Sequence, residues 1–146
     1  MTMSPIVRLA RPIFILLAFG LAAQSPGTVI VASKSSTLSS LTKAQLKKML
    51  TGADTKLPNG GGKALVITTA PGSPERVSAL KLFCGMTEQQ FNADQIHASF
   101  VGEERARART MPSGKAIVAA VENDASAIGI VSDADVTDAV KVLSVE

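Results

Sequence analysis

The chain of 146 residues has no Trp, no Tyr and only five Phe, so we do not expect an aromatic sugar cage or a base-stacking surface. It has one cysteine, Cys84, which excludes an internal disulfide, and one histidine, His97. A metal centre rich in histidine is therefore excluded, and we expect neither a metal site nor a cofactor. No apolar run approaches the roughly 20 residues that span a bilayer, which argues against a polytopic membrane protein.

The first 23 residues have the pattern of a secretory signal peptide. They contain no acid, carry Arg8 and Arg11, and run apolar from Pro12 to Ala23. An apolar stretch of this length followed by small residues is typical of a cleaved leader, with cleavage after Ala22 or Ala23. An N-terminal membrane anchor is the alternative. We expect a signal peptide at 1–23, a domain at 24–146, and a periplasmic or secreted location.

The charge balance gives no reason to expect a nucleic-acid partner. The formal charge of the full chain is +3, but cleavage after Ala23 would remove Arg8 and Arg11 and no acid. The 15 Lys+Arg then fall to 13, against an unchanged 12 Asp+Glu. Nucleic-acid binding depends on clustered positive charge, which a nearly neutral domain does not supply.

Short β-branched runs alternate with amphipathic stretches along the rest of the chain. Thr42 with Gln45 and Thr87 with Gln90 have the spacing of capping boxes, so a helix is predicted after each threonine. Further helices are predicted from Pro74 to Gly85 and after Ser113. Buried strands are predicted at 28–32, 63–68, 127–131 and 140–143. This alternation predicts a layered α/β domain with a mostly parallel sheet.

Five short segments give the chain a familiar order of motifs: 29–31, 38–42, 50–52, 71–73 and 127–130. In this order and spacing the chain resembles the phosphate-binding periplasmic component of ABC transporters, and more closely its short, secreted, single-domain relatives. The resemblance covers about residues 28–146. It implies the type II periplasmic-binding-protein fold, with a length near that of one of its two lobes.

The resemblance also implies an anion site at the turn Thr69–Arg76, where the family has an arginine, an aspartate and a Gly-Ser-Gly-Thr run. Gly72 and Ser73 match that run. The remaining positions differ and are occupied by Thr69, Pro71, Pro74 and Glu75. Phosphate or a similar small oxyanion is the ligand that the resemblance implies.

Pro74 and Glu75 change the physics of this turn. A helix N-terminus attracts an anion through free N–H groups and its dipole, worth ~0.3–1 kcal/mol. Proline removes one N–H, and Glu75 adds a carboxylate that would repel a monoanion at ~5 Å by roughly 3 kcal/mol before screening. We therefore expect weak binding. Ser73-Pro74-Glu75 is also a good helix start that needs no ligand.

Three further residues are candidate ligand contacts. Ser113 begins a helix and is followed by Lys115, which an anion would favour; an N-cap role explains Ser113 equally well. Ser36 follows the first strand, where a parallel sheet presents ligand-binding loops, or it is an ordinary turn residue. Arg107 belongs to an alternating run with Arg105 and Arg109 that could replace the missing arginine, or it lies on a solvated strand face that Glu103 and Glu104 neutralise.

An enzyme is not expected. Cys84 falls on the apolar face of its predicted helix, and a nucleophilic role would need His97 as its base. Asp133, Asp135 and Asp138 lack the glycine and the terminal glutamate of a calcium loop.

The sequence therefore predicts an exported module that binds phosphate or a similar oxyanion. Its partners would be an ABC transporter permease or another envelope protein, or a second copy in a homodimer. The alternative is an envelope protein outside transport that uses the same lobe for protein contact or as a sensor accessory.

Overall fold

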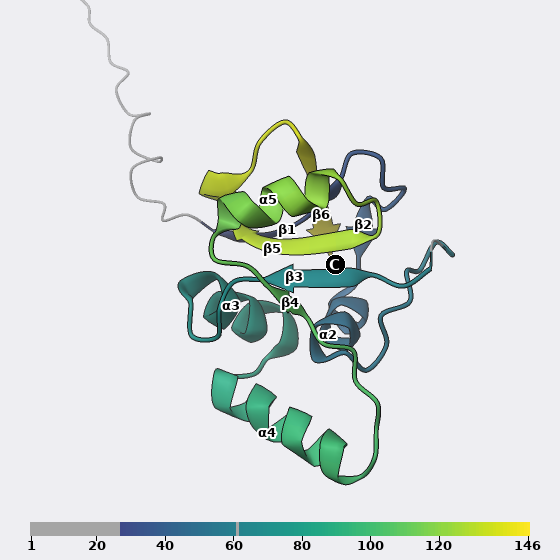
Figure 1. Cartoon of the computed structure of the whole chain (residues 1–146), viewed down its shortest axis with the longest axis vertical. Coiled ribbons are helices and arrows are strands. Elements are labelled where there is room, and N and C mark those ends of the chain that lie inside the picture. The colour runs from purple at the N-terminus through teal and green to yellow at the C-terminus, as the bar shows by residue number, and fades with distance from the viewer. Residues whose placement is uncertain (1–26, 61) are drawn as a thin grey trace, which may run out of the picture.

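The computed structural model describes residues 27–60 and 62–146, so the predicted signal peptide lies outside the described residues. These residues form one mixed sheet with helices on both faces (Figure 1). The six strands are β1 (Thr28–Ser33), β2 (Ser40–Leu41), β3 (Leu65–Thr68), β4 (Arg109–Thr110), β5 (Ala127–Ser132) and β6 (Val140–Val145). The helices are α2 (Lys43–Thr51), α3 (Pro74–Ala79), α4 (Glu88–Phe100) and α5 (Gly114–Glu122). A π-helix, η1 (Leu80–Cys84), continues α3, and a 3-10 turn, η2 (Asp133–Asp135), follows β5.

The strand order is β2-β6-β1-β5-β3-β4. Three of the five pairings are parallel, namely β2 with β6, β3 with β5 and β3 with β4. Strand β1, by contrast, runs antiparallel to both of its neighbours, β5 and β6. The predicted α/β class is confirmed. The direction of β1 could not be read from its sequence, and it decides which loops share an edge of the sheet.

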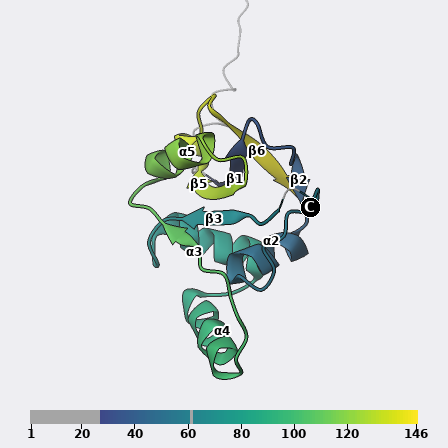
Figure 2. The same cartoon turned by 45° about the vertical axis from the view of Figure 1, so that its right-hand side comes forward.

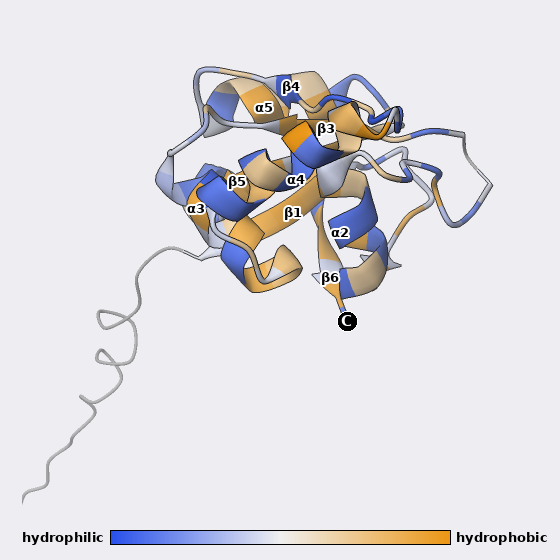
Figure 3. Cartoon of the chain, turned by 90° about the horizontal axis from the view of Figure 1, so that it is seen from below, coloured by the Kyte–Doolittle hydropathy of each residue, from blue (hydrophilic) through white to orange (hydrophobic). Residues whose placement is uncertain are grey.

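Alternate side chains of the central strands enter two separate cores. On β1 and β5, Ile30 and Ile130 pack into the core beneath α2, α3 and η1. Their neighbours Val31 and Val131 pack into the second core, against Ile117 of α5. This period of two is what a sheet covered on both faces requires. Figure 3 shows the result, with a hydrophobic β1 and an α2 that carries both hydrophobic and hydrophilic residues.

Both predicted capping boxes are present. The N–H of Gln45 donates to Thr42 Oγ1 at 3.1 Å, and the Thr42 N–H donates to Gln45 Oε1 at 2.9 Å. Thr87 and Gln90 make the same pair at the start of α4. These bonds satisfy N–H groups that a helix start leaves without partners. Thr42 and Thr87 therefore set where α2 and α4 begin.

Gly52 is the residue that ends α2, and the backbone of Ala106 contacts it there. It has φ +77°, and the Ala106 N–H donates to its carbonyl at 3.0 Å. A Cβ at Gly52 would lie 2.1 Å from the Ala106 carbonyl oxygen. Only glycine permits both this left-handed conformation and the close approach.

Helix α4 projects from the layered body and is the lowest element in both views of the chain (Figures 1 and 2). The segment 101–108 returns from its end to β4. Within the described residues, no helix is long and apolar enough to cross a membrane.

Candidate functional site

The turn between β3 and α3 contains the two residues that matched the implied anion site. The Ser73 N–H donates to the Ala70 carbonyl at 3.0 Å, and the Ser73 hydroxyl is hydrogen-bonded to the Thr69 hydroxyl. Ser73 is the N-cap residue of α3, as predicted, but its side chain makes no capping bond. Gly72, at φ +85°, donates its N–H to Glu88 Oε1 at 3.0 Å. The Gly72 N–H is therefore already engaged by a carboxylate of the chain.

A second helix start lies beside this turn. Ser113 caps α5, since its hydroxyl accepts the N–H of Ala116 at 3.1 Å. Gly114, the first residue of α5, is buried, and a Cβ added to it would lie 2.1 Å from Asp135 Oδ2. The Asp135 carboxylate therefore lies directly against the first turn of α5, where the helix dipole favours negative charge.

Ser73 and Ser113 line one open pocket of about 380 Å³, which we call the turn pocket. Its charged residues are Lys115, Glu75 and Asp135. The remaining lining residues are Thr69, Ala70, Pro112 and Gly114. The turn pocket thus offers hydroxyls, two helix starts and one ammonium group, but also two carboxylates. It suits a polar ligand, and the carboxylates oppose a free dianion.

Ser36 follows β1 and lies at the opposite end of the strands from the turn pocket. Ala32, near the end of β1, pairs with Ile128 near the start of β5, because these strands are antiparallel. The turn pocket is at the other end, where β3 and β5 finish in parallel. The expectation that Ser36 follows a parallel strand is therefore wrong. The Ser36 hydroxyl accepts the Leu38 N–H at 3.2 Å, and its carbonyl accepts a bond from Lys141 Nζ at 2.6 Å.

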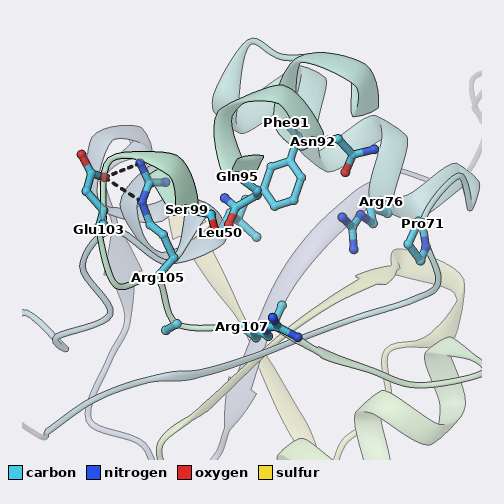
Figure 4. Close-up of a pocket in the computed structure, with 13 residues that line it drawn as sticks. Leu50, Pro71, Arg76, Phe91, Asn92, Gln95, Ser99, Glu103, Arg105 and Arg107 are labelled. Carbon is cyan, nitrogen blue, oxygen red and sulfur yellow. Dashed lines mark hydrogen bonds and ion pairs between the residues drawn. The ribbon is translucent and has the colours of Figure 1, made fainter. Parts of the chain in front are cut away.

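Arg107 lies in a different depression, between α4 and the segment 102–108, which we call the α4 groove (Figure 4). This groove has a volume of about 680 Å³ and shares no lining residue with the turn pocket. The structure therefore does not bring Arg107 together with Ser73 and Ser113. Arg109 lines neither of these two cavities.

Arg105, the first arginine of the alternating run, is held in place by ion pairs. Arg105 forms ion pairs of 3.0 Å with Asp94 and with Glu103, and Nη1 donates to the Thr51 carbonyl at 3.2 Å. Burial alone would lower the pKa of Arg105, but its hydrogen bonds and charge pairing with Glu103 and Asp94 raise that pKa above its ordinary value. The predicted neutralisation by Glu103 is present at Arg105.

Cys84 and His97 lie in different surroundings. Cys84 is buried in the core, as its helical position predicts, whereas His97 is exposed on α4. Burial raises the pKa of the Cys84 thiol to about 11, although the charge of Lys47 opposes the shift. A thiol with this pKa is protonated at neutral pH and is a poor nucleophile. No group of three or more His, Cys, Asp or Glu side chains in the described part of the chain could hold a metal ion.

Sequence reasoning considered Asp135 only as part of a calcium loop, which it excluded, and not as a residue of the turn pocket. A clue was available, because Asp135 follows strand 127–132, and its parallel neighbour 65–68 leads into the turn with Ser73. The carboxyl ends of parallel neighbours meet at one edge of a sheet, which is where the turn pocket lies.

The fold is that of one part of a phosphate ABC transporter substrate-binding protein, as solved structures show. An ABC-type phosphate transport receptor from Vibrio cholerae superposes with a TM-score of 0.64 at 24% identity, covering 82% of this chain and 46% of the receptor. PstS from Borrelia burgdorferi superposes with a TM-score of 0.62 at 15% identity, covering 83% of this chain and 47% of PstS. The chain thus spans about half the length of these proteins. At these identities the likeness establishes the fold.

Two other comparisons found no relative. No protein-family model matches the chain, and no curated protein matches it.

Proposed function

We propose that this chain is an exported solute-binding module that binds phosphate or a similar small oxyanion in the turn pocket. The observation that carries the proposal is the convergence of two helix starts, with Ser73 and Ser113, on one open pocket. Lys115 at the same pocket supplies the one positive charge. The similar structure from Vibrio cholerae is described as an ABC-type phosphate transport receptor, which supports the choice of ligand class.

The affinity we propose is low. Pro74 contributes no N–H to the first turn of α3, and the Gly72 N–H is bonded to Glu88. Glu75 and Asp135 add negative charge, and the pocket is open to solvent, so water and salt compete with the ligand. We expect a dissociation constant of ~0.1 mM or weaker for phosphate.

Titration calorimetry of the purified chain with phosphate, sulfate and chloride tests this function. Lys115→Gln should reduce phosphate binding, because it removes the one cation of the turn pocket. Lys81→Gln is the matched control, since Lys81 is also exposed on a helix but lies outside that pocket. No phosphate binding, or equal loss in both variants, would contradict the proposal.

A second candidate is a role in protein contact within the envelope. The observation that favours it is that each helix start of the turn pocket already has a carboxylate of the chain near it, Glu75 for α3 and Asp135 for α5. This face could then dock a permease, another envelope protein or a second copy. Light scattering with and without phosphate distinguishes the candidates: a ligand-independent dimer favours the second, and a monomer that binds phosphate favours the first.

Export belongs to the same proposal and rests on the leader of residues 1–23. N-terminal sequencing of the periplasmic or culture fraction should begin at Ala23 or Gln24. Full-length chain confined to the cytoplasm would contradict it.

A further inference from the structure

The α4 groove has the size and lining of a ligand site that is separate from the turn pocket. Its volume of about 680 Å³ falls within the range of about 300–1,000 Å³ that is usual for ligand pockets. One wall is the face of α4 with Phe91, Asn92, Gln95 and Ser99, and the other is the extended segment with Arg107 (Figure 4).

Two of the three arginines in this groove are neutralised within the chain. Arg76 forms a 2.9 Å ion pair with Glu88 and lies over the Phe91 ring, 5.0 Å from its centroid. Arg105 is paired with both Asp94 and Glu103. These pairs fix the walls of the groove, and the two arginines with their three carboxylates, Glu88, Asp94 and Glu103, carry one net negative charge.

Arg107 differs from Arg76 and Arg105, because no ion pair is found for it among the described residues. Among the described residues, the Arg107 side chain is exposed and makes no hydrogen bond or ion pair. Its guanidinium group is therefore available to an anionic group that enters the groove, and a guanidinium can hold a carboxylate through two parallel N–H···O bonds.

A small apolar recess adjoins the groove. The recess shares Leu50, Arg76, Phe91 and Ala108 with the groove, and its other lining residues are Thr68, Ala79, Leu80 and Ile130. Its volume of about 20 Å³ has room for one methyl-sized group. A site with one free cation at its edge and an adjoining apolar recess suits a ligand with an anionic head and a short apolar body.

We propose that the α4 groove binds a small amphipathic carboxylate, with Arg107 holding the carboxylate group and the recess between Leu50, Leu80 and Phe91 receiving the apolar end. This site does not depend on oxyanion binding in the turn pocket, because the two cavities have no lining residue in common.

The test is an amide NMR titration of the purified chain with hexanoate. Hexanoate should shift the amide signals of Leu50, Phe91 and Arg107. Hexylamine, which has the opposite charge, should not, and acetate, which lacks the apolar body, should bind at least 5-fold more weakly. Absence of hexanoate binding, or equal binding of hexylamine, overturns the proposal.

The alternating arginines offer a matched pair of variants. Arg107→Gln should weaken hexanoate binding at least 5-fold. Arg109→Gln should change it by less than 2-fold, because Arg109 is also exposed but does not line the groove. An equal loss in both variants would indicate a general charge effect and overturn the proposal.

A second variant tests the recess. Ala108 is half-buried and lines both the α4 groove and the recess. The Ala108→Leu side chain should therefore fill the space between them and abolish hexanoate binding. Far-UV circular dichroism establishes that the variant is folded. Unchanged hexanoate binding in a folded Ala108→Leu protein overturns the assignment of the recess. Phosphate titration of the same samples separates the two sites: loss of hexanoate binding with phosphate binding intact concerns the α4 groove alone.

Discussion

The carboxylate of Asp135 lies against Gly114, the first residue of α5, at a distance that leaves no space for a Cβ on the glycine. The 3-10 turn after β5 thus places a negative charge of the chain at a helix start that an external anion would also occupy. Asp135 therefore competes with any oxyanion in the turn pocket.

The first prediction concerns this competition. Asp135→Asn should strengthen phosphate binding by about 1 kcal/mol, roughly 5-fold, because a carboxylate a few ångströms from the anion is removed while solvent screens much of the repulsion. Titration calorimetry measures the change. Asp133→Asn is the control, since Asp133 lies on the same turn but does not line the turn pocket. Equal affinities of Asp135→Asn and the wild-type chain would show that phosphate binds elsewhere.

The second prediction concerns the start of α3. Glu75→Thr should strengthen phosphate binding by about 1–2 kcal/mol after solvent screening, because it removes a repulsive charge and supplies a hydroxyl. The same calorimetric titration checks it, with Glu104→Thr as a control for an acidic residue outside the turn pocket. Binding that is present but unchanged in Glu75→Thr would exclude the turn pocket as the anion site.

The third prediction concerns two glycines with the same backbone conformation and different surroundings. Gly52→Ala should lower the free energy of unfolding by more than about 3 kcal/mol, because left-handed strain adds to a clash with the Ala106 backbone. Gly85→Ala should cost only about 1–2 kcal/mol, since φ is +65° but no atom lies within 4 Å of the added Cβ. Urea unfolding of both variants gives the comparison. Similar losses would mean that the contact with Ala106 has no energetic weight.

The fourth prediction concerns Cys84. Its pKa is raised from 9.0 to about 11 in the folded chain, so the unfolded chain loses the thiol proton first as the pH rises. Between pH 9 and 11 the unfolded state binds fewer protons, and stability falls by up to about 2 kcal/mol. Urea unfolding at pH 8, 9 and 10.5 should show this loss in the wild-type chain and a smaller one in Cys84→Ala.

A thiol reagent gives an independent check of the same group. At pH 8 the folded chain should react slowly and the urea-unfolded chain rapidly, because the thiolate is the reactive form. Fast reaction of the folded chain would contradict the raised pKa.

The helix starts could be predicted from sequence because their determinants are local. Thr42 with Gln45 and Thr87 with Gln90 satisfy their own N–H groups within four residues, whatever the rest of the chain does. The strand runs were also predictable, since a short apolar, β-branched segment such as 28–32 favours a strand that is largely buried.

The arrangement of the candidate sites could not be predicted because it depends on strand direction. A fully buried strand has the same composition whether it runs parallel or antiparallel to its neighbours, so nothing in residues 28–33 places Ser36 far from Ser73. The separation of Arg107 from the turn pocket likewise depends on the path of residues 101–108 around α4, which no local pattern specifies.

The position of β1 in the sheet also determines when the fold can form. Both neighbours of β1 come from residues 127–145, about 100 positions later in the chain. A chain still under synthesis that lacks those residues has its first strand without a partner on either edge, and β3 without its neighbour β5. The central sheet therefore closes only after residues 127–145 have emerged, and pairing between segments so distant in sequence makes folding slow.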